Sequence, residues 1–326
     1  MSALSPEPAQ GLVSQVIGPI CVDINVDAEG RASRVVGGAA ICAAAAAASL
    51  GHEVEAVVTA AQEDAELLSR FPAAVRHVVA VDSERTSSIR NVYATADQER
   101  RVSTALAQAD PISARDIPSR EVTVRHLAGL MVGDYAPDIV DELSARGPLA
   151  VDMQGFLRQP DGATGELRFR RFEGGQEFYS RIRFLKVDTA EGEHLTGRSD
   201  RREIARALRD LGAREIMVSN AVEILILDDD GFHTCPLRPR SLAGRTGRGD
   251  TVFSAYITER ASHSADDALL TACATVSLKM ETPGPLDCGR ADVEDYLSRF
   301  YADIRDHADR RGCEERGCEE GASHGK

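Results

Sequence analysis

The sequence predicts an α/β protein built on a largely parallel, doubly wound sheet. Short apolar runs typical of buried strands alternate with helical patterns along most of the chain. Such alternation places helices on both faces of a parallel sheet. The alanine-rich stretch VVGGAAICAAAAAASLG, residues 35–51, is typical of a helix that lies close against that sheet. With 326 residues, the chain is long enough for one large domain.

The predicted elements follow one another along the chain. We expect strands at 12–18, 53–60, 126–133, 215–219 and 223–229, and a strand that runs into a polar loop within 148–158. We expect helices within 35–51 and at 63–71, 136–147, 200–211, 252–261 and 265–280. The stretch 184–197 predicts a strand followed by a short helix. Two regions break the alternation, at about 20–36 and 86–108, and these predict β-rich insertions that stand off the main sheet. The polar stretch 161–178 predicts a flexible excursion.

Composition excludes several classes of function. The net charge of −14 argues against general binding to nucleic acid or to anionic membranes. No apolar run approaches the roughly 20 residues that span a bilayer, and the first ten residues do not resemble a signal peptide, so we expect a cytoplasmic protein. The seven cysteines are irregularly spaced without a CxxC pair, which predicts reduced thiols and no zinc site. Nearly all cationic residues are arginine, which we interpret as codon bias.

A glycine-rich turn, AGRTGRGDT, lies before the predicted helix at 252–261. Gly247, Arg248, Gly249 and Asp250 are placed where the amides of a helix N-terminus can surround an anion. A carboxylate there would repel a phosphate, but Asp250 could take the proton of an attacking hydroxyl while the amides hold the phosphoryl group. The alternative is an ordinary acidic residue at a helix start.

The turn also resembles a family motif. RTGRGDTVFSAYI is similar to the DTxGxGD motif of the PfkB/ribokinase-like carbohydrate kinases. VVGGAAICAAAAAASLG resembles their N-terminal GG motif, and VDTAEGEHLTG resembles their N-x-x-E segment. The three occur in the family's order over roughly residues 12–300. The resemblance implies a ribokinase-like three-layer α/β/α sandwich with a small β-lid, with residues 1–308 as the kinase domain and 309–326 as a disordered tail.

The resemblance also implies an activity and a set of residues. Family members transfer the γ-phosphoryl group of ATP, with Mg²⁺, to a hydroxyl of a sugar, cyclitol or nucleoside. Asp250 would be the catalytic base, with the anion hole at Gly247, Arg248 and Gly249, and Glu191 would help to place Mg²⁺. Substrate would contact Asp23, Gly37, Gly38 and Asn91 under the lid. Nucleotide would lie near Asp188, Ser219, Asn220, Arg245, Thr246, Gly247 and Gly249, over the 229–244 loop and against 272–279.

Several positions depart from the family pattern. Gly244 and Arg245 stand where the motif has Asp and Thr, and Asp188 stands where N-x-x-E has Asn. Cys42 replaces an Asn that contacts sugar in many members. Arg248 occupies a position that is usually small, and its guanidinium either contacts phosphate or points to solvent. These departures motivate a second hypothesis, a catalytically silent nucleotide or sugar sensor of the same fold.

The segment VDMQGFLR and the lid residues bear on the substrate. Gln154 and Arg158 follow a predicted strand and would lie at the carboxyl edge of the sheet, where ligands bind in such folds, unless they belong to a surface loop. Together with TSSIRNVYATADQERR, this segment resembles members that act on inositol-like or nucleoside-like substrates. An exposed lid sheet would have open edges, which predicts pairing of two lids in a homodimer.

Overall fold

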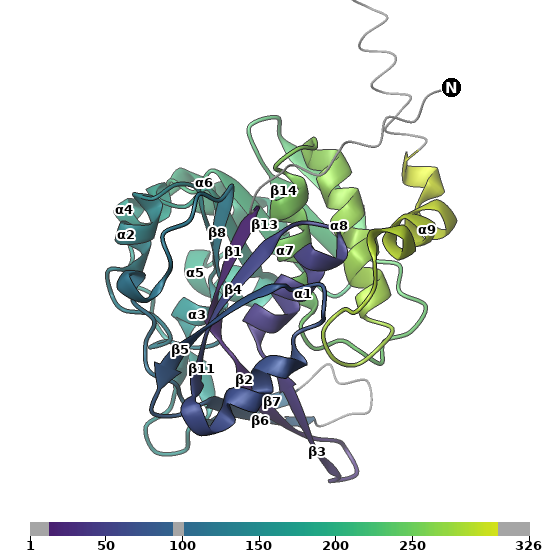
Figure 1. Ribbon diagram of the computed structural model, residues 1–326. Helices are drawn as coiled ribbons and strands as arrows, with labels where there is room; N and C mark the ends of the chain where they lie inside the picture. Colours follow the sequence, from purple (N-terminus) through teal and green to yellow (C-terminus); the bar gives the residue numbers. More distant parts are fainter. Residues whose placement is uncertain (1–12, 94–100, 306–326) are drawn as a thin grey trace, which may run out of the picture.

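The computed structural model describes residues 13–93 and 101–305. Its centre is a large sheet with helices packed against it (Figure 1). The sheet has nine strands in the order β15-β14-β13-β12-β9-β8-β1-β4-β5. The strands are β1 (Ser14–Pro19), β4 (Val54–Ala61), β5 (His77–Ser83), β8 (Val124–Leu127), β9 (Leu149–Asp152), β12 (Phe184–Asp188), β13 (Glu215–Ser219), β14 (Glu223–Leu227) and β15 (Phe232–Pro236). All pairs from β5 to β13 are parallel, and β14 and β15 are added antiparallel.

Helices cover both faces of this sheet. One face carries α1 (Ala39–Ser49), α7 (Arg248–Glu259) and α8 (Ala265–Lys279), with α9 (Arg290–Phe300) packed on α8. The other face carries α2 (Ile139–Ser144), α5 (Thr189–Thr196) and α6 (Arg201–Asp210). Successive strand residues point to opposite faces, so Val16 packs in the core under α1 while Ile17 packs in the opposite core. The predicted three-layer α/β/α arrangement is confirmed.

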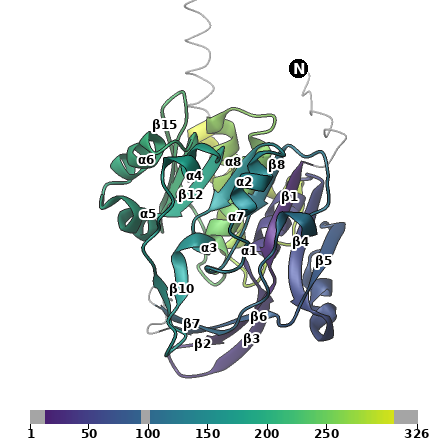
Figure 2. The same cartoon turned by 90° about the vertical axis from the view of Figure 1, so that its left-hand side faces the viewer.

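A second sheet of four strands, here called the lid sheet, projects from one end of the sandwich (Figure 2). Its order is β3-β2-β6-β7, and it consists of β2 (Cys21–Val26), β3 (Ala32–Gly37), β6 (Ser87–Tyr93) and β7 (Arg101–Ala107). These strands lie in the two segments that break the α/β alternation. A short hairpin of β10 (Arg158–Pro160) and β11 (Leu167–Phe169) joins β7 through a bridge between Thr104 and Glu166.

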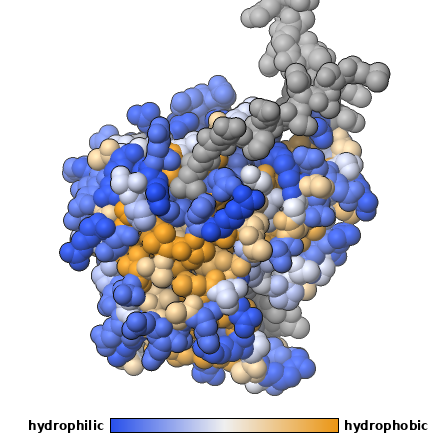
Figure 3. All heavy atoms as spheres, viewed as in Figure 1, coloured by the Kyte–Doolittle hydropathy of each residue, from blue (hydrophilic) through white to orange (hydrophobic). Residues whose placement is uncertain are grey.

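The remaining elements are short. They are η1 (Gln62–Arg70), η2 (Ala114–Asp116), α3 (Gln154–Leu157) and α4 (Gln176–Ser180). The 161–178 stretch, predicted as a flexible excursion, instead contributes β11 and the start of α4. Figure 3 shows apolar side chains gathered in the middle of one molecular face, with hydrophilic residues around them. Among the described residues, no helix has the length and apolar character needed to cross a bilayer.

Several predicted boundaries were wrong, and two of them bear on the site. The strand expected at 126–133 ends at Leu127, because the following residues turn and Asp134 accepts hydrogen bonds from the amides of Leu130 and Met131. The helix expected to begin at residue 252 begins at Arg248. The predicted tail at 309–326 lies outside the described residues.

Candidate active site

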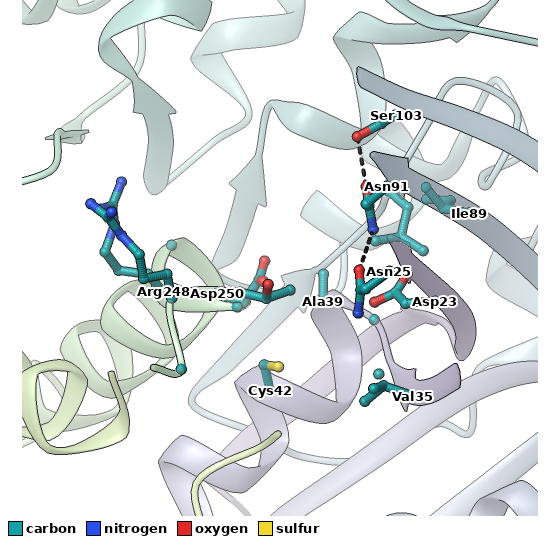
Figure 4. A pocket seen from close by; sticks show the side chains of 18 of the residues that line it. Asp23, Asn25, Val35, Ala39, Cys42, Ile89, Asn91, Ser103, Arg248 and Asp250 are labelled. Carbon is teal, nitrogen blue, oxygen red and sulfur yellow. Dashed lines mark hydrogen bonds between the residues drawn. The ribbon is translucent and has the colours of Figure 1, made fainter. Parts of the chain in front are cut away.

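A cavity of about 520 Å³ lies between the carboxyl ends of the central strands and the lid sheet (Figure 4). Asp188 and Ser219 are the last residues of β12 and β13, and both line it. The loop 243–250 closes one side, and residues of β2, β3, β6 and β7 form another. This position, outside the carboxyl ends of parallel strands, is where ligands bind in such folds.

The glycine loop ends where α7 begins. Gly247 is the N-cap residue with φ of 80°, and a Cβ there would lie 2.5 Å from Cys42 Sγ, so both conformation and space require glycine. The Arg248 amide donates to the carbonyl oxygen of Arg245 at 3.3 Å, and the amides of Gly249 and Asp250 in the first turn of α7 lack acceptors within the helix. Together with the helix dipole, they favour an anion at this end of the cavity.

Asp250 is the third residue of α7 and its carboxylate lines the cavity. Figure 4 shows it between Arg248 and the lid residues. Burial and the neighbouring Asp152 raise its pKa to about 6, while Lys186 is the largest influence that lowers it. At neutral pH the carboxylate is therefore ionised, and its pKa is close enough to 7 for efficient proton transfer.

Lys186, on β12, lies directly beneath the start of α7. Its ammonium donates to Asp152 Oδ2 at 2.8 Å, and a Cβ on Gly249 would lie 2.9 Å from its Nζ. Burial lowers the pKa of Lys186, but the carboxylates of Asp152 and Glu191 outweigh this and hold the pKa above its usual value. The side chain lines the cavity and is charged there.

The lid half of the cavity presents a ladder of neutral polar side chains. Strand register places Asn25 opposite Asn91 and Asn91 opposite Ser103. Ser103 Oγ donates to Asn91 Oδ1 at 2.7 Å, and Asn91 Nδ2 donates to Asn25 Oδ1 at 3.1 Å (Figure 4). Asp23, on the same strand as Asn25, has its pKa raised by burial. This half can contact several hydroxyls at once.

The structure brings together nearly all of the predicted site residues. Those that line the cavity are Asp23, Gly37, Gly38, Asn91, Gln154, Arg158, Asp188, Ser219, Arg245, Thr246, Gly247, Arg248, Gly249 and Asp250. Asn220 does not line it, because its Oδ1 accepts from the amides of Val222 and Glu223 in the β13–β14 turn. Gln154 and Arg158 belong to α3 and to β10, in the segment that was predicted as a polar loop after a strand.

Glu191, the predicted magnesium residue, lies below the cavity wall. Its side chain has no exposure, and its Oε2 accepts from the Asp188 amide at 2.8 Å while Asp188 Oδ1 accepts from the Glu191 amide. Its Oε1 lacks a hydrogen bond and lies 3.7 Å from Arg158. Asp188 is therefore the acidic residue of this pair that faces the cavity. Within residues 13–93 and 101–305, no group of three or more His, Cys, Asp or Glu side chains could hold a metal ion.

The cavity lining also contains residues that were not predicted, and four polar ones among them are Asn25, Ser103, Lys186 and Lys279. The two lysines had a signal in the sequence, because the chain contains 38 cationic residues and only three of them are lysine. The arginine-rich composition was interpreted as codon bias, but that bias makes each retained lysine conspicuous. Asn25 and Ser103 carried no comparable signal.

The comparisons agree with this geometry. Residues 15–291 match the model of the pfkB family of carbohydrate kinases. This chain belongs to that family. It is therefore a phosphotransferase that acts on a hydroxyl of a sugar-like substrate. No curated protein matches the chain significantly.

Solved structures of the ribokinase family are similar along most of the chain. A pyrophosphate-dependent kinase in complex with sulfate is 32% identical, with a TM-score of 0.80, over 86% of this chain and 99% of that one. A pyrophosphate-dependent myo-inositol-1 kinase variant is 30% identical, with a TM-score of 0.79, over 89% and 100%. Ribokinase from Arabidopsis thaliana is 17% identical, with a TM-score of 0.69, over 88% and 99%, and supports the predicted ribokinase-like fold.

Proposed function

We propose that this enzyme transfers a phosphoryl group from inorganic pyrophosphate to a hydroxyl of a cyclitol of the inositol type. The observation that carries the choice of donor is the charge of the cavity beside Asp250. Its lining is rich in cations there, with Arg158, Lys186 and Arg245. Such a site suits a short, highly charged donor.

The region expected to hold a nucleotide base is filled by the chain itself. On α8, Ala272, Cys273, Val276 and Ser277 have no exposed surface. The Arg238 amide donates to Ser277 Oγ at 3.0 Å, and the hydroxyls of Ser277 and Tyr301 lie 2.8 Å apart. These contacts bury a part of α8 that the family resemblance placed against the nucleotide. They favour pyrophosphate over ATP, the donor that the family resemblance implied.

The proposed reaction places Asp250 between the acceptor hydroxyl and the phosphate donor. Its carboxylate takes the proton of the acceptor hydroxyl as that oxygen attacks the terminal phosphorus of pyrophosphate. The phosphorus–oxygen bond to the other phosphate breaks, which gives a phosphate monoester and orthophosphate. The first amides of α7 and the Lys186 ammonium stabilise charge on the moving group. Asp188 would hold a hydrated Mg²⁺, which would neutralise donor phosphates, and Glu191 would orient Asp188.

The neutral ladder in the lid supports a cyclitol acceptor. Asn25, Asn91 and Ser103 offer amide and hydroxyl groups to a ring with several hydroxyls. In the similar myo-inositol-1 kinase, replacing one Asn and one Ser by Leu gives a myo-inositol-3 kinase. This chain presents an Asn and a Ser that are hydrogen-bonded to each other beside the cavity. We infer that they contact the acceptor and select its reacting hydroxyl.

A screen of donors and acceptors tests the proposal. The purified protein with Mg²⁺ would receive pyrophosphate or ATP, together with inositol isomers, sugars or nucleosides, and products would be identified by ³¹P NMR. We expect an inositol phosphate with pyrophosphate, at a rate that depends on the acceptor. Equal or faster turnover with ATP would overturn the donor but keep the kinase. Absence of any product with either donor would favour the silent sensor.

Pairing of two lid sheets in a homodimer remains a prediction, and exposed apolar side chains on the lid sheet support it. The outer strands β3 and β7 expose Val35, Val102 and Leu106, by 37%, 53% and 50%. We propose that these exposed side chains of the lid sheet contact a second copy of the chain. A dimeric mass in solution at micromolar concentration, lost in a Val102→Asp variant, would support this pairing. A monomeric mass for the unmodified protein would overturn it.

A further inference from the structure

A second buried lysine, at the C-terminal end of α8, reaches the glycine loop from the side opposite Lys186. Lys279 is 1% exposed, and its ammonium donates to the carbonyl oxygen of Gly244 at 2.6 Å and to that of Thr246. Burial lowers its pKa, an effect opposed by Cys42 and Asp250. Its described hydrogen-bond partners are thus main-chain carbonyls of the loop, whereas Lys186 pairs with a carboxylate.

The loop is shaped to meet this lysine. The Gly244 amide donates to the carbonyl of Met280 at 2.7 Å, and a Cβ on Gly244 would lie 1.8 Å from the Thr282 carbonyl oxygen. Only glycine permits this approach of the loop to the end of α8. The departure from the family's Asp at position 244 and the lysine at 279 therefore belong to one local arrangement.

Binding the carbonyls also fixes the amides of the loop. In a trans peptide the N–H points opposite to the C=O of the same unit. The carbonyls of Gly244 and Thr246 point at Lys279, so the amides of Arg245 and Gly247 are directed away from it. Residues 245 and 247 line the cavity. A positive charge held behind these peptide units strengthens their dipoles toward an anion on the other side.

We propose that Lys279 is a tethered cation that positions the anion-binding loop, and that it makes a bound alkali or ammonium ion unnecessary for the reaction. The inference rests on the proposed phosphoryl transfer. Lys279 occupies the point where two carbonyl oxygens converge, which is the donor set that a monovalent cation would need. It acts through the loop, as a positioning residue, and does not contact the reacting atoms.

The first test uses the unmodified enzyme in chloride salts of K⁺, Na⁺, NH₄⁺ and choline at equal ionic strength. We expect its rate to vary by less than about twofold among them, because the tethered charge already occupies the site. Activation of several fold by K⁺ or NH₄⁺ over choline would overturn the proposal. This arm needs no variant and does not depend on how a variant folds.

The second test uses Lys279→Ala in the same salts. Loss of the positioned loop predicts a fall of about 10²-fold in kcat, with acceptor KM nearly unchanged. NH₄⁺ or K⁺ can enter the vacated space and should raise the kcat of the variant by at least about tenfold, whereas choline should not raise it. Normal kcat in choline, or a loss that no small cation repairs, would contradict the proposal.

A measurement without turnover separates this inference from the proposed function. Thermal unfolding of Lys279→Ala should shift upward in NH₄Cl or KCl relative to choline chloride, and the unmodified protein should show no such difference. Ser277→Ala, on the same helix and outside the cavity lining, is the matched control and should be equally destabilised in every salt. If no kinase activity is found, these shifts still decide the role of Lys279, and equal shifts for the variant and the unmodified protein would reject it.

Discussion

The two halves of the cavity recognise their ligands by different physics. The half beside α7 combines a helix N-terminus with Arg158, Lys186 and Lys279, and it attracts charge. The lid half, called the neutral half below after its ladder of Asn25, Asn91 and Ser103, distinguishes the placement of hydroxyls. Asp23 and Arg101 also belong to its lining. Asp250 lies where the two meet. Under the proposed function, donor affinity and acceptor choice are therefore set by separate structural elements.

The difference also has a structural origin. The charged half is anchored in the main sandwich, where β9, β12 and α7 are buried and their side chains have fixed partners such as the Lys186–Asp152 pair. The neutral half is carried by a small sheet whose outer strands are largely exposed. Changes in the lid can therefore alter the acceptor without disturbing the phosphoryl-transfer groups.

The largest effect is expected from Asp250→Asn, which removes the group shared by both halves. Without a base, kcat should fall by about 10³–10⁴-fold, while binding of pyrophosphate should be kept or strengthened because a negative charge is lost. Stopped assays would measure kcat, and calorimetry would measure pyrophosphate binding. Full activity in this variant would refute the assignment of the base.

Lys186→Met removes a positive charge from the half of the cavity beside α7 and leaves the lid half unchanged. We expect kcat to fall by about 10²-fold. The acid limb of the pH–rate profile, which the pKa of Asp250 places near pH 6 in the unmodified enzyme, should move to higher pH, because Lys186 is the main group that lowers that pKa. A profile over pH 5–9 measures both effects.

The control for Lys186→Met is the double variant Lys186→Met, Asp152→Asn. It removes both members of the buried pair, so it avoids the cost of leaving a carboxylate unpaired. Its stability should recover relative to the single variant, but its rate should not. Recovery of the rate with the stability would mean that Lys186 only maintains the fold.

The sequence was most informative where local pattern alone decides the structure. The alternation of strands and helices, the GG turn before α1 and the glycine loop before α7 can each be interpreted from neighbouring residues. The polar ladder cannot, because Asn25, Asn91 and Ser103 become neighbours only through the registers of β2 with β6 and of β6 with β7. Nothing near Asn25 in the sequence specifies its strand partner.

Contacts between buried side chains were the hardest part of the site to predict. Glu191 was assigned to magnesium by resemblance, and its place in the α5 capping box puts it outside the cavity lining. Whether Asp188 or Glu191 faces a ligand depends on the conformation of the first turn of α5, which the sequence pattern does not specify. Likewise, the separation of 34 residues between Asp152 and Lys186 hides a pair that two parallel strands bring together.

A substitution in the neutral half should alter selection of the acceptor and leave the donor unaffected. For the pair Asn91→Leu with Ser103→Leu, we expect acceptor KM to rise by about 10–100-fold, or the phosphorylated position to change, with pyrophosphate KM within about threefold. Product NMR and initial rates would measure this. Ser88→Ala is the matched control, because it lies on β6 outside the cavity lining and should change neither constant. An equal loss of pyrophosphate affinity would show that the halves are not separate.

The smallest expected effect is on stability. It measures how far the buried charge of Asp250 lowers the free energy of unfolding. The folded-state pKa of Asp250, about 6, exceeds the ordinary value of 3.8, so the favourable contribution of its protonated form is complete below pH 4 and is lost as the pH rises through 6. Asp250→Asn lacks this titration. At pH 7.5 its free energy of unfolding should therefore exceed that of the unmodified protein by about 1–2 kcal/mol, and its unfolding temperature should be higher. At pH 4 the two proteins should unfold at nearly the same temperature. Calorimetric scans without ligand at the two pH values would test this, and a variant that is less stable at pH 7.5 would mean that the surrounding cations already compensate the buried carboxylate.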